Sequence, residues 1–131
     1  MTEHPNATTV QAALDAFAGG DLEGYVAYFS TDVLWHVGGA NPLSGDYRGR
    51  AAVLDYLQRA RDRSDDSLRV EPQSVMADDR YCAVFVRVTG KRGDRPLDVR
   101  MAECFRFDES GRLTEFWALA DDQPAIDRFW A

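Results

Sequence analysis

The sequence has few of the residues and motifs by which common classes of enzyme are identified. Its 131 residues include two histidines and two cysteines, and their spacing matches no metal-ligand motif. Gly38-Gly39 is followed neither by Lys-Ser/Thr nor by a third spaced glycine, which excludes the usual phosphate-binding loops. No serine lies in a nucleophile elbow, and neither cysteine has an evident histidine partner. We therefore expect no metal and no cofactor, and either a cofactor-independent reaction or a binding role.

Long apolar runs and an excess of basic residues are also absent. No apolar run approaches the roughly 18 residues that a membrane span needs, so no membrane partner is expected. The net charge of −7 makes the surface repel nucleic-acid phosphates, and we expect no nucleic-acid partner. Residues 1–9 show no secretory signal. Cys82 and Cys104 lie in apolar strand-like runs, where we expect reduced thiols of a cytoplasmic protein.

The first half of the chain predicts three helices. Residues 1–8 are expected to form a flexible tail, and apolar residues then recur at helical spacing in residues 10–17, 22–29 and 50–63. Residues 33–37 are rich in β-forming side chains and predict a strand. The Gly/Pro/Asn-rich residues 38–46 predict a long loop, and long ordered loops often border a functional site.

The second half predicts four strands in a meander. Period-two patterns cover residues 68–76, 81–89, 96–107 and 113–120, and a short helix follows near residue 121. The order of elements predicts an α+β fold in which helices cover one face of a mostly antiparallel sheet. Because the middle strands are apolar on both faces, we expect a second copy of the chain to cover the other face, forming a homodimer.

One charged residue interrupts an apolar row in the strand expected at residues 96–107. Alternate positions from Leu97 to Phe107 are apolar except Glu103. A carboxylate in such a row is costly unless it is hydrogen-bonded, paired or neutral. Glu103 is therefore a candidate acid/base group with a raised pKa. The alternative is a structural carboxylate bonded to a tyrosine or to an arginine such as Arg48 or Arg87.

His36 is the second candidate catalytic residue, because an ordinary histidine pKa near 6.5 suits proton transfer. A structural histidine bonded to the sheet edge or to the adjacent loop is the alternative. Six further residues are candidates for lining a pocket for an apolar ligand: Trp35, Tyr56, Met101, Phe105, Phe116 and Trp117. Core packing would explain each of them as well, and Trp117 could instead lie on the dimer face.

Several segments resemble the SnoaL-like proteins of the nuclear transport factor 2-like, or ketosteroid isomerase-like, superfamily. The resemblance extends from about residue 10 to residue 130 and rests on Gly20-Asp21-Leu22-Glu23-Gly24, Trp35-His36, residues 42–49, Phe105-Arg106-Phe107 and Glu115-Phe116-Trp117. It implies one domain over residues 1–131: a cone-shaped α+β barrel in which three N-terminal helices, a curved, mostly antiparallel sheet and a short C-terminal helix enclose a deep apolar pocket. The superfamily includes isomerases, polyketide cyclases, epoxide hydrolases, dehydratases and non-catalytic binders, so the fold alone does not define the reaction.

The resemblance preserves one of three catalytic positions of the ketosteroid isomerases. Their oxyanion-contacting acid falls at Glu103, whereas their general base falls at Val37 and their oxyanion tyrosine at Ala13. Steroid-type isomerisation by the same residues is therefore not expected. His36 could act as a base, but alternation places it on the opposite strand face unless a bulge turns it.

These observations predict a cofactor-independent enzyme that isomerises, cyclises or dehydrates an apolar, polyketide-like molecule, with Glu103 and His36 as its acid/base pair. A non-catalytic binding or assembly domain of the same fold is the alternative. The two hypotheses differ in whether Glu103 and His36 must face one cavity. Epoxide hydrolysis would need an Asp-Arg-Asp network, which Asp46, Arg48 and Arg100 do not obviously form.

Overall fold

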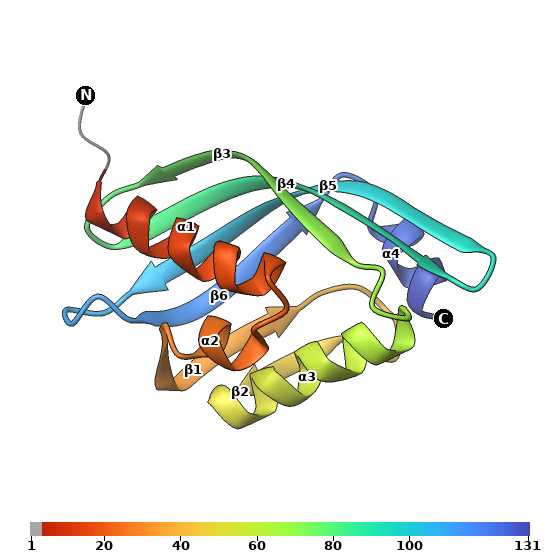
Figure 1. Cartoon of the computed structure of the whole chain (residues 1–131), viewed down its shortest axis with the longest axis horizontal. Coiled ribbons are helices and arrows are strands. Elements are labelled where there is room, and N and C mark those ends of the chain that lie inside the picture. Colours follow the sequence, from red (N-terminus) through yellow and green to blue (C-terminus); the bar gives the residue numbers. More distant parts are fainter. Residues whose placement is uncertain (1–3) are drawn as a thin grey trace.

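A six-stranded sheet in the order β2-β1-β6-β5-β4-β3 forms the frame of the protein (Figure 1). The computed structural model describes residues 4–131. Its strands are β1 (Phe29–Val37), β2 (Gly45–Arg48), β3 (Arg69–Ala77), β4 (Tyr81–Arg92), β5 (Arg95–Phe107) and β6 (Leu113–Ala120). β1 and β6 pair in parallel, and the other neighbouring strands are antiparallel. The sheet is curved, and the long β4–β5 hairpin extends beyond its neighbours at one end (Figure 1).

Three helices cover one face of this sheet. They are α1 (Pro5–Ala18), α2 (Leu22–Val26) and α3 (Arg50–Arg63). α1 packs against β3 and β4, α3 packs against β1 and β2, and α2 lies between the two helices (Figure 1). A fourth helix, α4 (Gln123–Trp130), packs against β5 near the end of the β4–β5 hairpin. The predicted α+β class, with three N-terminal helices on a curved, mostly antiparallel sheet and a short C-terminal helix, is confirmed.

Side-chain alternation gives the sheet two different faces. In β4, Cys82, Val84 and Val86 are fully buried on the face under the helices, which we call the inner face. Tyr81 and Phe85 point to the opposite, outer face, where about half of each side chain is exposed. The core therefore lies between the inner face and the helices.

The first helix begins earlier than the apolar spacing predicts. It starts at Pro5, because a proline suits the first helical position, where its missing N–H is not needed. The ring Nδ1 of His4 accepts a hydrogen bond from the Asn6 amide at 3.1 Å and caps the helix. Of the expected tail, residues 5–8 are thus helical, and residues 1–3 lie outside the described residues.

Two other boundaries differ from the sequence pattern. Phe29 begins β1 rather than continuing the helical stripe, since α2 ends at Val26. The predicted loop also contains part of a strand, because residues 45–48 form the edge strand β2, which pairs with residues 34–37 of β1. Gly49 ends β2 at φ +89°, a conformation that favours glycine, and α3 follows directly. No helix in the described part of the chain combines the length and the apolar character that crossing a bilayer requires.

Candidate active site in the apolar cavity

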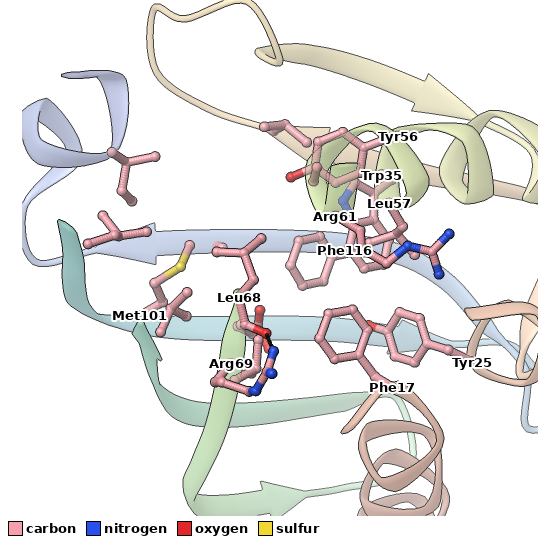
Figure 2. Close-up of a pocket in the computed structure, with 18 of the residues that line it drawn as sticks. Phe17, Tyr25, Trp35, Tyr56, Leu57, Arg61, Leu68, Arg69, Met101 and Phe116 are labelled. Carbon is pink, nitrogen blue, oxygen red and sulfur yellow. Dashed lines mark hydrogen bonds between the residues drawn. The ribbon is translucent and has the colours of Figure 1, made fainter. Parts of the chain in front are cut away.

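A cavity of about 450 Å³ lies between the inner face of the sheet and the helices. Figure 2 shows its labelled lining side chains, which come from α1, α2, α3 and four strands; the apolar and aromatic ones are Phe17, Tyr25, Trp35, Tyr56, Leu57, Leu68, Met101 and Phe116. A mostly apolar cavity of this size lies within the range of small-molecule binding sites, roughly 300–1,000 Å³.

Glu103 lies in the β5 wall of this cavity, on the inner face beside Met101. Among residues 4–131, no group donates a hydrogen bond to its carboxyl, and the two arginines considered as partners bond elsewhere. Arg87 forms two hydrogen bonds with Asp98, at 2.9 and 2.7 Å. Arg48 donates only a long hydrogen bond, at 3.5 Å, to the Asp32 carbonyl oxygen.

Burial raises the pKa of Glu103 from 4.5 to about 7. The cause is desolvation, because the apolar surroundings penalise the ionised form and no cation compensates. Some surface of the side chain remains accessible, since it opens into the cavity rather than packing against other side chains. At neutral pH, Glu103 is therefore present in both protonation states and can either donate or accept a proton.

Two tyrosine hydroxyl groups belong to the same cavity. Tyr25 comes from α2 and Tyr56 from α3, and burial raises the pKa of both above that of an ordinary tyrosine. The negative charge of ionised Glu103 raises both pKa values further, which requires that the three groups lie near one another. Neither hydroxyl makes a hydrogen bond with a residue in the range 4–131. Both phenols thus stay protonated and remain available as hydrogen-bond donors.

The Tyr25 ring is held by aromatic contacts. It meets Phe17, Phe29 and Trp35 edge to face, at centroid distances of 5.3, 5.0 and 6.2 Å. In the sequence, Tyr25 belongs to the apolar stripe of a helix, and its site role was not predicted. The polar tip of a tyrosine within a buried stripe is the one signal that could have indicated it.

His36 lies on the outer face of the sheet, away from Glu103. Its Nδ1 is 2.8 Å from Asp46 Oδ1, and its Nε2 is 2.7 Å from Glu115 Oε2. The ring also stacks over Trp117 at 5.9 Å. The hydrogen bond to Glu115 raises the pKa of His36, and Asp46 adds to this effect. The pairing of β1 with β2 is regular from Leu34 to Val37, so no bulge turns His36 inward.

The sheet therefore separates the two residues that were expected to act together. The expectation of a Glu103–His36 acid/base pair needs correction, because the His36 ring is bonded to carboxylates on the outer face while Glu103 opens inward. His36 is also among the residues that line the cavity, but its imidazole is hydrogen-bonded to Asp46 and Glu115.

The six expected lining residues divide into three groups. Trp35, Tyr56, Met101 and Phe116 lie in the cavity wall. Phe105 is fully buried and does not line the cavity, but it packs against the lining residue Phe116 at a centroid distance of 5.1 Å. Trp117 lies on the outer face, in a shallow apolar depression.

The loop after β1 borders one end of the cavity, as its length led us to expect. The Oδ1 atom of Asp127 on α4 accepts hydrogen bonds from the Ala40 amide at 3.0 Å, from Asn41 Nδ2 at 2.8 Å and from Gln123 Nε2 at 3.2 Å. These bonds lower the pKa of Asp127 and fasten the loop to the helix. Asn41 and Gln123 both line the cavity, so this network fixes its border.

A curved sheet closed by helices around a deep apolar cavity, with one carboxyl group in the wall, defines a protein of the nuclear transport factor 2-like class. Residues 10–116 match the family profile of the SnoaL-like domain. The chain belongs to the SnoaL-like family. No group of three or more histidine, cysteine, aspartate or glutamate side chains within residues 4–131 is arranged to hold a metal ion.

Solved structures agree with this assignment. Bal32a, from a soil-derived mobile gene cassette, is 28% identical with a TM-score of 0.91, and the match covers 96% of each chain. A nuclear transport factor 2-like protein from Burkholderia xenovorans is 23% identical with a TM-score of 0.81, covering 100% of this chain and 99% of that one. A proposed isomerase from Rhodopseudomonas palustris is 28% identical with a TM-score of 0.68, covering 95% and 98%. A search among curated proteins gave no match.

Proposed function

We propose that this protein is a cofactor-independent enzyme that moves protons on an apolar small molecule bound in the cavity. The observation that carries the proposal is the Glu103 carboxyl, which has no hydrogen-bond donor among the described residues and a pKa of about 7 inside an apolar cavity of about 450 Å³. A general acid/base works best when its pKa lies near the working pH. Isomerisation, cyclisation and dehydration all need such a group.

The chemistry needs a carbonyl group on the ligand. The ligand also needs a C=C bond beyond the carbon next to the carbonyl. Ionised Glu103 takes a proton from that carbon; the electrons of the C–H bond form a new C=C bond, and the π electrons of the carbonyl move to its oxygen, giving a dienolate. The hydroxyl of Tyr25 or Tyr56 donates a hydrogen bond to this oxygen and stabilises its charge. Protonated Glu103 then donates the proton to the far carbon of the dienolate, and the electrons on oxygen re-form the carbonyl, so the C=C bond has moved by one position and the isomerisation is complete. One carboxyl group thus serves as both base and acid.

The relatives support this reaction class. The family is SnoaL-like, and the Rhodopseudomonas palustris neighbour at 28% identity is a proposed isomerase. A polyketide-like ligand, which the resemblance to polyketide cyclases implies, would suit the aromatic walls that Trp35 and Phe116 provide, stacked at a centroid distance of 3.8 Å. A cytoplasmic location remains part of the same proposal.

A non-catalytic binder is the second candidate. It is favoured because Val37 and Ala13 occupy the positions of the general base and the oxyanion tyrosine of the ketosteroid isomerases, and because the His36 ring lies on the outer face. Such a protein would use the same cavity to hold a hydrophobic ligand, and Glu103 would only accept a hydrogen bond or donate one.

Deuterium exchange separates the two candidates. The probe is 2-tetralone, an apolar ketone whose protons beside the carbonyl are replaced slowly in D₂O and can be followed by NMR. The enzyme proposal expects the protein to accelerate this exchange and Glu103→Gln to remove the acceleration while 2-tetralone still binds. Glu109→Gln, in the exposed turn before β6, is the matched control and should behave as the wild type. Binding without acceleration by the wild type would instead support the binder.

We also propose that a second copy of the chain covers the outer face of the sheet. This face carries the large exposed apolar side chains Met76, Tyr81, Phe85 and Leu119. Some of its charges are paired within one chain, as in Arg87–Asp98 and Arg106–Glu115, which lowers the repulsion that an identical copy would meet there.

Sedimentation analysis tests the homodimer. Leu119 is 77% exposed, and an arginine there would place an unpaired charge in the middle of the proposed interface. Leu119→Arg should therefore sediment as a monomer at concentrations where the wild type is a dimer. Ala51→Arg, at an exposed position of α3, is the control and should remain a dimer. A monomeric wild type would refute the proposal.

A further inference from the structure

Two arginines line the cavity where it opens to solvent. Arg61 lies in the last turn of α3 and Arg69 is the first residue of β3, and both are labelled in Figure 2. Apart from His36, whose ring is bonded to Asp46 and Glu115, they are the only basic residues among the described residues that line the cavity. The Arg61 side chain is 41% exposed and Arg69 is also exposed, whereas Tyr25 and Trp35 deeper in the cavity are buried. The two arginines therefore mark the mouth of the cavity.

Both guanidinium groups keep unused hydrogen-bond donors. The Arg61 group approaches Asp62 at 3.9 Å, which is too long for a hydrogen bond. Arg69 uses one nitrogen, Nη1, to donate to the carbonyl oxygens of Asp66 and Leu68, both at 2.8 Å. These two bonds hold Arg69 in place and leave its other nitrogens free of partners within residues 4–131. A side chain that is already oriented loses less conformational entropy when it binds a ligand.

The turn between the two arginines is an unusual one. Asp65 and Asp66 both have positive φ angles, 54° and 57°, which residues other than glycine rarely adopt, although aspartate tolerates them best. Backbone hydrogen bonds from Asp66 N to the Arg61 carbonyl oxygen at 2.8 Å and from Ser67 N to the Ser64 carbonyl oxygen at 3.0 Å hold this conformation. The turn thus fixes the end of α3 next to the start of β3, and the two arginines with them.

The charges around the cavity favour one orientation of a charged ligand. The chain as a whole carries −7, yet its cavity mouth holds two arginines and one carboxylate, that of Asp66. Inside the cavity the titratable carboxyl group is Glu103, whose ionised form would repel a second anion. A ligand with one negative charge would accordingly place that charge at the mouth and its apolar body inside.

We propose that the cavity binds an apolar carboxylic acid, whose carboxylate is held at the mouth by Arg61 and Arg69. The inference names the ligand class for the proposed function and rests on it only in assuming that this cavity is the ligand site. An arginine–carboxylate contact is a charge-assisted hydrogen bond, stronger than a neutral one. The anionic end would also set the position of the ligand body relative to Glu103.

Calorimetric titration tests the proposal with 4-biphenylacetate and its neutral amide, 4-biphenylacetamide, which have the same apolar body. The wild type should bind the carboxylate about tenfold more tightly than the amide, as expected for one charge-assisted contact. Arg61→Gln and Arg69→Gln should each reduce this preference, and the double variant should abolish it. Arg63→Gln, exposed on the same helix and outside the cavity, should keep it.

Equal affinity for the two compounds, or no binding of either, would overturn the proposal, as would an unchanged preference in the double variant. Failure of the catalytic proposal would look different. Glu103→Gln should keep the preference for the carboxylate, and a wild type that shows this preference without accelerating deuterium exchange would refute catalysis while supporting the carboxylate site.

Discussion

Replacing Glu103 by glutamine should stabilise the protein at alkaline pH and leave its stability nearly unchanged at pH 4. Glutamine has the same shape and cannot ionise, so the substitution removes the charge and keeps the packing. The pKa of Glu103 is about 7 in the folded protein, against 4.5 for an ordinary glutamate. That difference corresponds to ~3 kcal/mol of free energy of unfolding, as an upper figure, because water in the cavity would reduce it.

The sign of the effect follows from proton binding. Below about pH 4, Glu103 is protonated in the folded and the unfolded chain, and it contributes no pH dependence. As the pH rises from about 4.5 to about 7, the unfolded chain loses the proton first, so the folded state binds more protons and the free energy of unfolding falls. Above pH 7 the full penalty of the buried charge is present, and the glutamine variant is free of it.

Urea unfolding at pH 4, 6 and 8, followed by tryptophan fluorescence, measures this effect. Other groups also titrate, so the quantity of interest is the difference in free energy of unfolding between variant and wild type at each pH. That difference should grow by ~2–3 kcal/mol between pH 4 and pH 8. Glu109→Gln, in an exposed turn, should show a flat difference. Parallel profiles for Glu103→Gln and the wild type would refute the reasoning that Glu103 is buried without a partner.

Three further substitutions test other parts of the site. Tyr25→Phe should keep the fold but reduce the deuterium exchange of 2-tetralone at least about tenfold, which NMR would measure; an unchanged rate would exclude Tyr25 as the oxyanion donor. His36→Gln should leave exchange unchanged, because the His36 ring bonds Glu115 on the outer face, and should lower the free energy of unfolding at pH 6 more than at pH 9 in urea titrations. Gly39→Ala should destabilise the protein by about 1 kcal/mol or more in thermal unfolding, since Gly39 has φ +86° and a Cβ there would collide with Asp127; an unaltered melting temperature would contradict it.

The sequence predicted most reliably which face of the sheet a side chain occupies, because this depends only on the two-residue alternation of a strand. In β5, the alternation from Leu97 to Phe107 placed Glu103 on the buried face, and the structure has it there, because neighbouring side chains in a strand must point to opposite faces. The same rule placed His36 on the other face of β1, with a bulge as the exception. The pairing with β2 is regular at this point, so the exception does not apply.

Features that depend on distant contacts were not predictable from local pattern. Arg61 belongs to a charged helix end, and such a pattern predicts a face exposed to solvent. It lines the cavity together with Arg69, the first residue of β3, which the local sequence pattern does not indicate. β2 is four residues long and gains its strand conformation from pairing with β1. Its first two residues belong to the Gly/Pro/Asn-rich segment 38–46, which by local pattern predicts a loop. Tyr25 lies on a predicted apolar stripe, and its hydroxyl becomes a site group only when Glu103 lies nearby.

The two faces of the sheet each hold a titratable group whose pKa is raised, and both groups lower the free energy of unfolding as the pH rises. His36 has a pKa raised above 6.5 by Glu115, so its stabilisation is complete below that pH and is lost as the pH rises through the raised value. Because the pKa of Glu103 is raised to about 7, its ionisation lowers the free energy of unfolding as the pH rises from about 4.5 to about 7. At low pH, Asp98 and Asp108, whose pKa values are lowered, lose their stabilisation as they are protonated. The free energy of unfolding should therefore be greatest between about pH 4 and 5, and a variant lacking both Glu103 and His36 should lose its decline toward alkaline pH.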